Sequence, residues 1–356
     1  MSTIKTRNGR SRPHAMRIAT GVAIVAIATG LAACGSSTTS SESAGPESSA
    51  SASEVPAGTT PLTLQSAWIN DAEFMGFYVG KDLGYYDQEG VDLTYVPGGP
   101  DVSPETQLLT GQADIALTTP DATAKAISEQ GAPFKIVGAL FQKSPLGILS
   151  LADGANITKP KDLIGKTIAA GTGATVAIQA MLKANGIALD DVKIVPYSFD
   201  PQVILSGKVD GAAEFCPDTP YVIEQKGGKP VCTLLSDLGY NMYNDTVVVT
   251  EDELANNRDA IIGFLKASRK GWEENFKDPA HYPAMFADTW FKGTGREVAH
   301  ETYYNEHSKP MMANPDGYFS MTDAEVKAIV KQLKASGIDA SVDMFDTSLM
   351  AEVNGS

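Results

Sequence analysis

Trp68, Asn70, Asp71 and Phe74 crowd together where an alternating apolar pattern gives way to a helical one. An indole can stack on a flat ring while an amide and a carboxylate hydrogen-bond to the edge of that ring. Phe74 belongs to an apolar helix face, yet from the first turn its ring can also reach a cleft. The structural alternative is that Trp68 fills the core while Asn70 or Asp71 only caps the helix. We favour ring binding for Trp68, and the roles of Asn70 and Asp71 stay open.

Two further groups offer hydroxyls, a carboxylate and backbone amides. Thr119 and Asp121 lie in "TTPDAT", although an Asp that follows Pro is also a common helix start. Gly173 and Thr175 lie in "AGTGAT", a glycine-rich turn whose amides could hold a carbonyl or an anion. A tight structural connection is the alternative for this turn.

The fourth group, "EFCPDTP", places Glu214, Phe215 and Asp218 within five residues. A carboxylate beside an aromatic ring can hydrogen-bond to the edge of an amino-substituted nitrogen heterocycle. The ligand of an open α/β sheet lies beyond the carboxyl ends of its strands. All four groups occupy such junctions, so we expect them to line one cleft.

Other chemical signals are weak. "IGKT" at residues 164–167 lacks the first glycine of a phosphate-binding loop. The pairs His300-Glu301 and Glu306-His307 lack the spacing of a zinc-binding helix, so we expect both on a solvated helix face. The sequence therefore predicts no metal, no cofactor and no catalytic residue.

The elements that must position these groups alternate along the chain. Strands are expected near residues 62–68, 91–96, 113–117 and 134–140, with helices between them. A second block repeats the scheme, and residues 108–138 resemble residues 204–234 in sequence. Alternation of this kind predicts an α/β fold with mostly parallel sheets flanked by helices. After residue 250 the pattern is helical.

The first 33 residues have the features of a lipoprotein signal peptide. Five basic residues and no acidic residue accompany a short apolar run that ends in Leu-Ala-Ala before Cys34. We expect cleavage before Cys34, lipidation of its sulfur and a location on the extracytoplasmic face of the cell membrane. An ordinary signal peptide is the alternative. Residues 34–60 are polar and predict a disordered linker.

The chain has 28 basic and 43 acidic residues, and removal of the first 33 residues would leave a net charge of −20. Such a charge argues against nucleic acid as a partner. The arginines that remain lie in the C-terminal helical part, which we expect to be away from the cleft: Arg258, Arg269 and Arg296. Cys216 and Cys232 either pair or remain free thiols.

Several stretches carry a resemblance to a known family. They are Trp68, "GYYDQEGVDL" (84–93), "LLTGQADIAL" (108–117) with the Pro-Asp after it, and "DLIGKTIAA" (162–170). The chain resembles the solute receptors of ABC importers for sulfonates, nitrate and vitamin precursors, a family that includes the yeast pyrimidine synthases of thiamine biosynthesis. "PGGP" and "SPETQLL" (97–109) resemble the branch with receptors for the thiamine pyrimidine and for riboflavin.

The resemblance implies a two-lobed periplasmic-binding-protein fold of type II, with the ligand in a cleft between the lobes. It implies that Trp68 faces the ring of the ligand. Lobe I would comprise residues 61–152 and 245–356, and lobe II residues 153–244. The chain would cross between them at "GILSLAD" (147–153) and "YNDTVVV" (243–249). The protein would be a monomer that delivers its ligand to a membrane permease.

The predicted function is the extracytoplasmic substrate-binding component of an ABC importer. The expected ligand is a small, flat nitrogen heterocycle, first a thiamine pyrimidine precursor and next a riboflavin-like molecule. An alkyl sulfonate or another small anion is the alternative within this class. The alternative of another class is an enzyme of pyrimidine synthesis, or a catalyst that uses Glu214 or Asp218 as acid or base. The resemblance argues against a synthase, because residues 118–123 lack the histidine and residues 238–249 lack the cysteines of the yeast enzymes.

Overall fold

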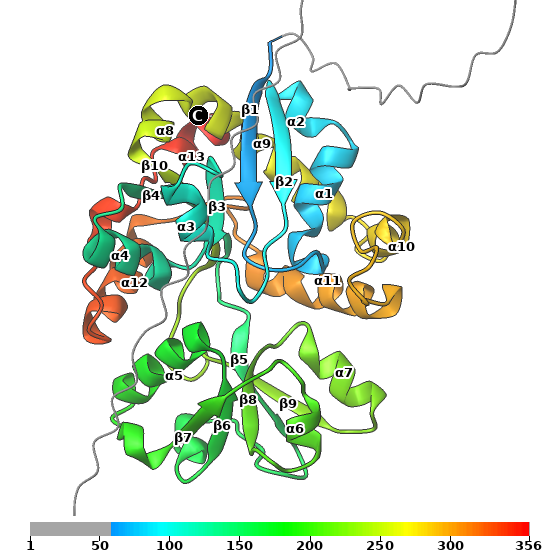
Figure 1. Cartoon of the computed structure of the whole chain (residues 1–356), viewed down its shortest axis with the longest axis vertical. Helices are drawn as coiled ribbons and strands as arrows, with labels where there is room; N and C mark the ends of the chain where they lie inside the picture. The colour runs from blue at the N-terminus through cyan, green and yellow to red at the C-terminus, as the bar shows by residue number, and fades with distance from the viewer. Residues whose placement is uncertain (1–57, 356) are drawn as a thin grey trace, which may run out of the picture. The chain divides into compact units, whose positions relative to one another are not determined.

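Two five-stranded sheets organise residues 58–355, the part of the chain that the computed structural model describes. Figure 1 shows the two sheets in separate lobes. The first sheet has the order β2-β1-β3-β10-β4 and consists of β1 (Thr60–Gln65), β2 (Val91–Val96), β3 (Ile115–Thr118), β4 (Phe134–Phe141) and β10 (Asn244–Thr250). The second has the order β7-β6-β8-β5-β9 and consists of β5 (Leu146–Leu151), β6 (Thr167–Ala170), β7 (Lys193–Pro196), β8 (Gly211–Phe215) and β9 (Pro230–Leu234).

The strand directions of the two sheets match position by position. In the first sheet β10 runs antiparallel to both β3 and β4, whereas β1 pairs in parallel with β2 and β3. In the second sheet β5 runs antiparallel to both β8 and β9, whereas β6 pairs in parallel with β7 and β8. Each sheet thus has one reversed strand. In lobe I it is β10, the first strand after the chain returns from lobe II. In lobe II it is β5, the first strand after the chain leaves lobe I. The predicted α/β class with mostly parallel sheets is confirmed.

The sequence repeat noted above has a structural counterpart. The carboxylate of Asp114 accepts a hydrogen bond from the backbone N–H of Thr63 at 2.7 Å, and Asp114 N–H donates to Thr63 O. Asp210 makes the same pair of hydrogen bonds with Thr167 in the second lobe, with its carboxylate at 2.8 Å. The repeated Leu-x-Gly-x-x-Asp segment therefore ties the strand that follows it to its parallel neighbour, β3 to β1 in lobe I and β8 to β6 in lobe II.

The lobe boundaries differ from the prediction. The segment "GILSLAD" was expected to cross between lobes, but most of it belongs to β5, which pairs on both edges within the second sheet. An apolar extended segment satisfies its backbone groups by such pairing. The chain crosses instead at residues 142–145 and 235–243, so lobe II begins near residue 146 and not at residue 153.

Helices cover the sheets of both lobes (Figure 1). Lobe I has η1 (Ala72–Phe74), α1 (Met75–Asp82), α2 (Tyr85–Gln88), α3 (Pro104–Leu109), α4 (Pro120–Gln130), α8 (Glu251–Asn256), α9 (Arg258–Asn275), α10 (His281–Phe286), α11 (Val298–Met312), α12 (Asp323–Ala335), η4 (Val342–Met344) and α13 (Leu349–Val353). Lobe II has η2 (Pro160–Leu163), α5 (Thr172–Ala184), η3 (Leu189–Asp191), α6 (Gln202–Leu205) and α7 (Thr219–Gln225).

The core of lobe I is built where α1 packs on α9. Trp272 and Phe77 are fully buried there, with ring centroids 6.3 Å apart. A Cβ atom at Gly271 would lie 2.1 Å from the carbonyl oxygen of Gly76, so glycine at this position allows the two helices to meet. This packing fixes the helix that follows the Trp68 segment, and it therefore positions one wall of the site.

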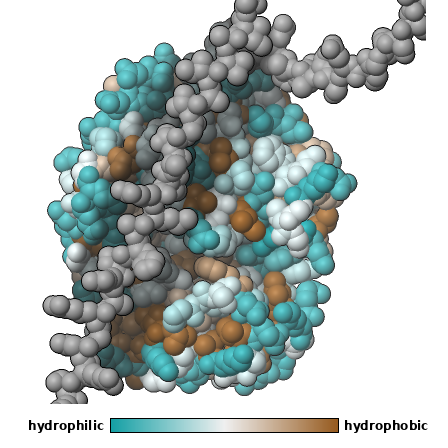
Figure 2. Space-filling model, in the orientation of Figure 1, coloured by the Kyte–Doolittle hydropathy of each residue, from teal (hydrophilic) through white to brown (hydrophobic). Residues whose placement is uncertain are grey.

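The surface of the described residues is largely hydrophilic on the face shown in Figure 2, with hydrophobic residues gathered over part of the second lobe. Within residues 58–355 no helix combines the length and the apolar character that a membrane span requires. The predicted signal peptide, the lipidation site Cys34 and most of the linker lie outside the described residues.

Candidate functional site

A cavity of about 810 Å³ is lined by residues of both lobes. Such a volume is typical of sites for small molecules and cofactors. Most of the predicted site residues line it, namely Trp68, Asp71, Thr119, Asp121, Gly173, Glu214, Phe215 and Asp218. The junctions after β1, β3, β6 and β8 thus meet at one place, which is the arrangement expected at the carboxyl ends of these strands.

Trp68 lies in the bend after β1, where hydrogen bonds fix its backbone. Its carbonyl oxygen accepts from Ser66 Oγ at 2.9 Å and from Gly98 N–H at 2.8 Å. A Cβ atom at Gly98 would lie 2.4 Å from Ser66 O, so the bend needs glycine there. The half-buried indole meets Phe199 of lobe II, with centroids 5.2 Å apart and planes tilted by 59°.

The polar neighbours of Trp68 have different roles. Asp71 caps η1, because its Oδ1 accepts from Glu73 N–H at 3.0 Å, and it also lines the cavity. Asn70 does neither: its Oδ1 accepts from Tyr78 Oη at 3.2 Å. Phe74 is fully buried in the core beside Tyr95. It is not among the described residues that line the cavity, so the expectation that its ring reaches the cleft is not met.

The second and third junctions line the cavity with short side chains and backbone. Thr119 precedes α4, and burial is the largest cause that raises the pKa of Asp121 above its ordinary value. Gly173 lies in the first turn of α5. The N-cap residue of this helix is Gly171, so no side chain caps the helix. Thr175 does not line the cavity, because its hydroxyl donates to Gly171 O at 2.9 Å along the helix.

Glu214 and Asp218 form an acidic wall on lobe II. Glu214 accepts hydrogen bonds from the hydroxyls of Tyr197 and Thr219, while burial raises the pKa of Glu214 to about 7. For Asp218, burial alone would raise the pKa. A hydrogen bond from His300 and the charge of Arg296 outweigh burial, and the pKa of Asp218 lies below its ordinary value.

The expectation that all three arginines lie away from the cleft is wrong for Arg296. Its guanidinium lines the cavity and donates to Asp218 Oδ1 at 2.7 Å. Its Nε also donates to Glu301, which is fully buried and accepts from Ala72 N–H at 2.6 Å. Arg296 therefore joins lobe I to lobe II, and two carboxylates already balance its charge.

The expected solvated helix face is also wrong for His300 and Glu301. His300 Nε2 lies 2.6 Å from Asp218 Oδ1, and Glu301 has no exposed surface. Residues 306 and 307 are exposed, as expected. His300 and Tyr304 are four residues apart on α11 and both line the cavity, a spacing that places side chains on one helix face. Arg296 reaches the same cavity from the residues just before α11.

Sequence reasoning missed other lining residues as well. Glu73 and Tyr304 lie on the lobe I wall, and Asp245 lies where the chain re-enters lobe I. Phe199 lies in an irregular loop with φ of +57°, a backbone conformation that non-glycine residues adopt mainly at special sites. No feature of the sequence around Phe199 marks it as a site residue. Asp245 lies in the segment "YNDTVVV", which the resemblance implies as a crossing between the lobes.

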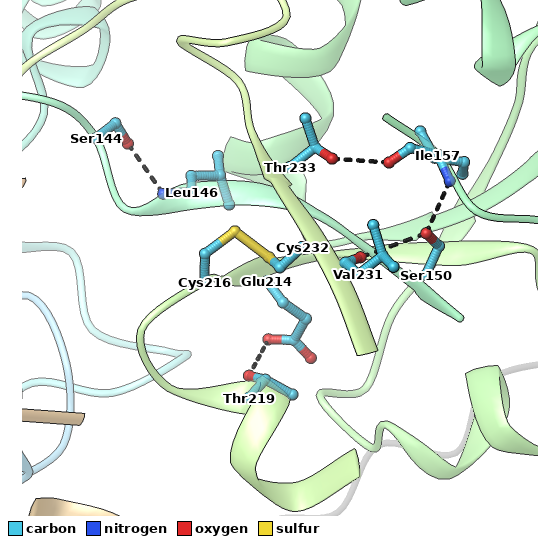
Figure 3. Close-up of a disulfide and its surroundings, with 10 residues drawn as sticks. All are labelled: Ser144, Leu146, Ser150, Ile157, Glu214, Cys216, Thr219, Val231, Cys232 and Thr233. Carbon is cyan, nitrogen blue, oxygen red and sulfur yellow. Dashed lines mark hydrogen bonds between the residues drawn. A yellow bond between two sulfur atoms is a disulfide. The ribbon is translucent and has the colours of Figure 1, made fainter. Parts of the chain in front are cut away.

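A disulfide supports the acidic wall. Cys216 and Cys232 are bonded, which resolves the alternative left open by the sequence (Figure 3). Cys216 lies between Phe215 and Asp218, so the bond ties the junction after β8 to β9, the strand on the other side of β5. In the described residues no cluster of histidine, cysteine or carboxylate side chains could hold a metal ion.

Comparisons with known proteins agree with this architecture. The profile of the family described as NMT1/THI5 like matches residues 71–282. The riboflavin-binding protein RibY of Chloroflexus aurantiacus is 24% identical over 269 residues, which cover 73% of this chain and 74% of that protein. The formylaminopyrimidine-binding protein of Halalkalibacterium halodurans is 23% identical over 278 residues, which cover 72% of this chain and 79% of that protein.

Solved structures show the same fold. The periplasmic aliphatic sulfonate-binding protein SsuA of Escherichia coli has a TM-score of 0.61 and 17% identity, over 78% of this chain and 85% of that chain. The predicted periplasmic-binding-protein fold and the predicted role as the solute-binding component of an ABC importer are confirmed. The chain belongs to the NMT1/THI5-like family.

Proposed function

We propose that the cavity binds a small, flat nitrogen heterocycle, with a thiamine pyrimidine precursor as the first candidate and a riboflavin-like molecule as the second. One observation carries this proposal: aromatic rings and carboxyl groups line the same cavity, and the charge of Arg296 is already balanced. The two relatives named above also bind, by their names, a flavin and a pyrimidine.

The aromatic part of the lining suits a flat ligand. Trp68 approaches from lobe I, and Phe199 with Tyr197 approaches from lobe II. Rings of this kind give a large apolar contact area and favour stacked or edge-to-face contacts with another ring. Phe199 is 48% exposed, so its side chain has room to adjust when a ligand enters.

The polar part of the lining suits a ligand that donates hydrogen bonds. Asp71, Glu73, Asp121 and Glu214 present carboxyl oxygens, which accept hydrogen bonds when ionised. An amino-substituted heterocycle offers such donors at its edge. A sulfonate or nitrate would instead place negative charge beside these carboxyl groups, and it would have to compete with Asp218 and Glu301 for Arg296.

The proposal extends to location and mode of action. Lipidation at Cys34 would tether the protein outside the cytoplasmic membrane, and the predicted linker of residues 34–60 would act as the tether. The protein would act as a monomer that passes its ligand to a permease and leaves the ligand chemically unchanged. The pyrimidine-synthesis alternative predicts turnover, which product analysis after prolonged incubation with the purified protein detects.

A ligand panel tests the proposed ligand class. The soluble chain from residue 35 onward should bind either 4-amino-5-hydroxymethyl-2-methylpyrimidine or riboflavin in calorimetry and gain thermal stability, since a ligand that binds only the folded form stabilises it. An alkanesulfonate serves as the comparison. Binding of the sulfonate together with failure of both heterocycles would sink the proposal.

Trp68→Ala tests the aromatic wall. We expect at least a tenfold loss of affinity for the heterocycle, because a buried aromatic contact is a typical hot spot. The ligand-induced change in tryptophan fluorescence should disappear, although Trp272 and Trp290 remain. Trp290→Phe is the matched control, since Trp290 does not line the cavity. Unchanged affinity in Trp68→Ala would contradict the assignment.

A further inference from the structure

Asp245 is an unusual residue in the wall of the cavity. It lies at the start of β10 with φ of +46°, where the chain returns from lobe II, and it has no exposed surface. Its Oδ1 accepts a hydrogen bond from Asn244 Nδ2 at 3.2 Å. Its Oδ2 is buried and accepts no hydrogen bond from the residues that the structure describes. A buried carboxylate oxygen without a partner is costly, so something must satisfy it.

Glu73 is the residue that could satisfy Asp245 Oδ2. It is 3% exposed, lines the same cavity and accepts from Tyr304 Oη at 3.1 Å through Oε2. The carboxyl groups of Glu73 and Asp245 line the same cavity, and each affects the pKa of the other. A hydrogen bond between two carboxyl groups requires a proton on one of them, because an ionised carboxylate only accepts.

The charges around this pair also favour a retained proton. Asp71 faces it from the cap of η1, and Asp218 faces it from the N-cap position of α7. On the side of α11 lie Tyr304, Glu301 and His300, with Arg296 just before the helix. Arg296 and His300 both contact Asp218, so the positive charge of Arg296 is directed there and not toward Asp245.

The pKa shifts agree with this geometry. Burial and then the charge of Asp245 raise the pKa of Glu73 well above its ordinary value. Burial raises the pKa of Asp245 to about 7, although the carboxyl group of Glu73 acts in the opposite direction. Two interacting carboxyl groups titrate as a pair, and the first proton to bind belongs to both.

We propose that Glu73 and Asp245 share one proton in the unliganded protein and pass it to a ring nitrogen of a basic, amino-substituted heterocycle. An O–H bond of the pair breaks and an N–H bond forms on the ligand, so the ring becomes a cation beside two carboxylates. No proton leaves the complex. A protonated ring nitrogen beside an amino group presents two parallel N–H donors, which a carboxylate binds with both oxygens.

This inference rests on the proposed function and narrows it. The ligand would be a basic heterocycle of the aminopyrimidine type, because its ring nitrogen can accept a proton near neutral pH. The flavin ring is far less basic and would not accept the proton. The pair therefore distinguishes the two candidate ligands by chemistry, although both are flat and both carry nitrogen.

Ultraviolet absorption tests the proton transfer. The probe is 4-amino-5-hydroxymethyl-2-methylpyrimidine at pH 8, where the free probe is neutral. On binding to the wild-type protein, its spectrum should change to that of the protonated ring. Asp245→Asn should abolish this change and weaken binding at least tenfold. Asp237→Asn is the matched control, since Asp237 is an exposed residue of the crossing segment that leads into β10 and does not line the cavity.

Infrared spectroscopy tests the shared proton directly. The wild-type protein at pH 7 should show the C=O stretching band of protonated carboxyl groups, and titration with the pyrimidine should remove the part of that band that comes from the pair. Glu73→Gln provides a second variant if Asp245→Asn does not fold, and it should also lack that part of the band. Absence of the band from the ligand-free wild-type protein would overturn the inference.

Other outcomes separate this inference from the proposed function. A pyrimidine that binds with the spectrum of the neutral ring overturns the proton transfer and leaves the proposed function intact. Riboflavin binding without pyrimidine binding has the same consequence. If no heterocycle binds, both proposals are overturned.

Discussion

Arg296 shows how one side chain changes the chemical character of a wall. Without it, Asp71, Asp218 and Glu301 would place three carboxylates around a buried space. With it, Asp218 and Glu301 are ion-paired, and the carboxyl groups of Asp71, Glu73 and Asp245 remain in the lining. The arginine thus acts in the lining as a partner of carboxylates, which supports the proposed preference for a ligand without negative charge.

The same residues predict how stability depends on pH. Burial raises the pKa of Asp71, Glu73, Asp245 and Glu214, so the folded chain retains protons that the unfolded chain releases. Stability from such groups is fully present below their ordinary pKa near 4 and is lost as the pH rises through about 7. Asp218, with its lowered pKa, acts only at more acidic pH.

We therefore expect the wild-type protein to be more stable at pH 5.5 than at pH 8. The melting temperature should differ by about 5 °C, since a few kcal/mol correspond to several degrees in a chain of this size. Thermal unfolding followed by circular dichroism checks this. Asp245→Asn should reduce the difference, whereas a melting temperature that rises with pH would contradict the assignment of raised pKa values.

At the scale of elements, the disulfide and one glycine hold the lobe II wall in place. A Cβ atom at Gly147 of β5 would lie 2.4 Å from Cys216 Sγ and 2.6 Å from Thr233 O. Glycine there lets the disulfide pass over β5 between β8 and β9, its two neighbours in the sheet. The junction that bears Glu214, Phe215 and Asp218 is thereby held by β8 and by the disulfide.

Loss of this disulfide should weaken both the fold and binding. The double variant Cys216→Ser/Cys232→Ser should lose about 2–4 kcal/mol of unfolding free energy, as expected for a loop of about 16 residues. Affinity for the heterocycle should fall as well, because the junction gains freedom. Urea unfolding and calorimetry measure the two effects. A reductant should reproduce them in the wild-type protein and change nothing in the double variant.

Particular elements show how far the sequence could predict this fold and site. Periodic segments such as residues 91–96 became strands, and the repeated Asp114 and Asp210 reflect two equivalent lobes. Pairing partners were not visible, so β5 was taken for a crossing. Arg296 and Phe199 were missed because the other lobe, far away in sequence, defines their role. Contacts of this kind depend on tertiary structure and leave no local pattern.

At the scale of the whole binding unit, several contacts join the lobes around the cavity. Trp68 meets Phe199, Arg296 pairs with Asp218, and Tyr221 of α7 stacks on His300 of α11. The ring centroids of Tyr221 and His300 are 4.7 Å apart, with planes inclined by 15°. Tyr221 also meets Tyr303 at 5.4 Å. These contacts stabilise the arrangement in which ligand is enclosed, and a ligand that bridges both lobes shifts the equilibrium toward it.

A change at Tyr221 tests how the contacts between the lobes affect ligand binding. Tyr221 does not line the cavity, so the residues that contact the ligand stay the same. Tyr221→Ala removes the cross-lobe stack, and aromatic pairs of this kind contribute about 0.5–1.5 kcal/mol. We expect affinity for the heterocycle to fall roughly threefold to tenfold, mainly through faster dissociation. Small-angle scattering should show a larger radius of gyration for the unliganded variant.

Tyr221→Phe keeps the ring and should behave as the wild-type protein does, which separates loss of stacking from loss of the hydroxyl. Stopped-flow fluorescence resolves the dissociation rate. If Tyr221→Ala bound and released its ligand at wild-type rates, the stack would be a passive contact, and closure would depend on Arg296 and Asp218 instead. A change in association rate alone would likewise contradict a role in holding the lobes together, because a contact that keeps the lobes together around the ligand slows its dissociation.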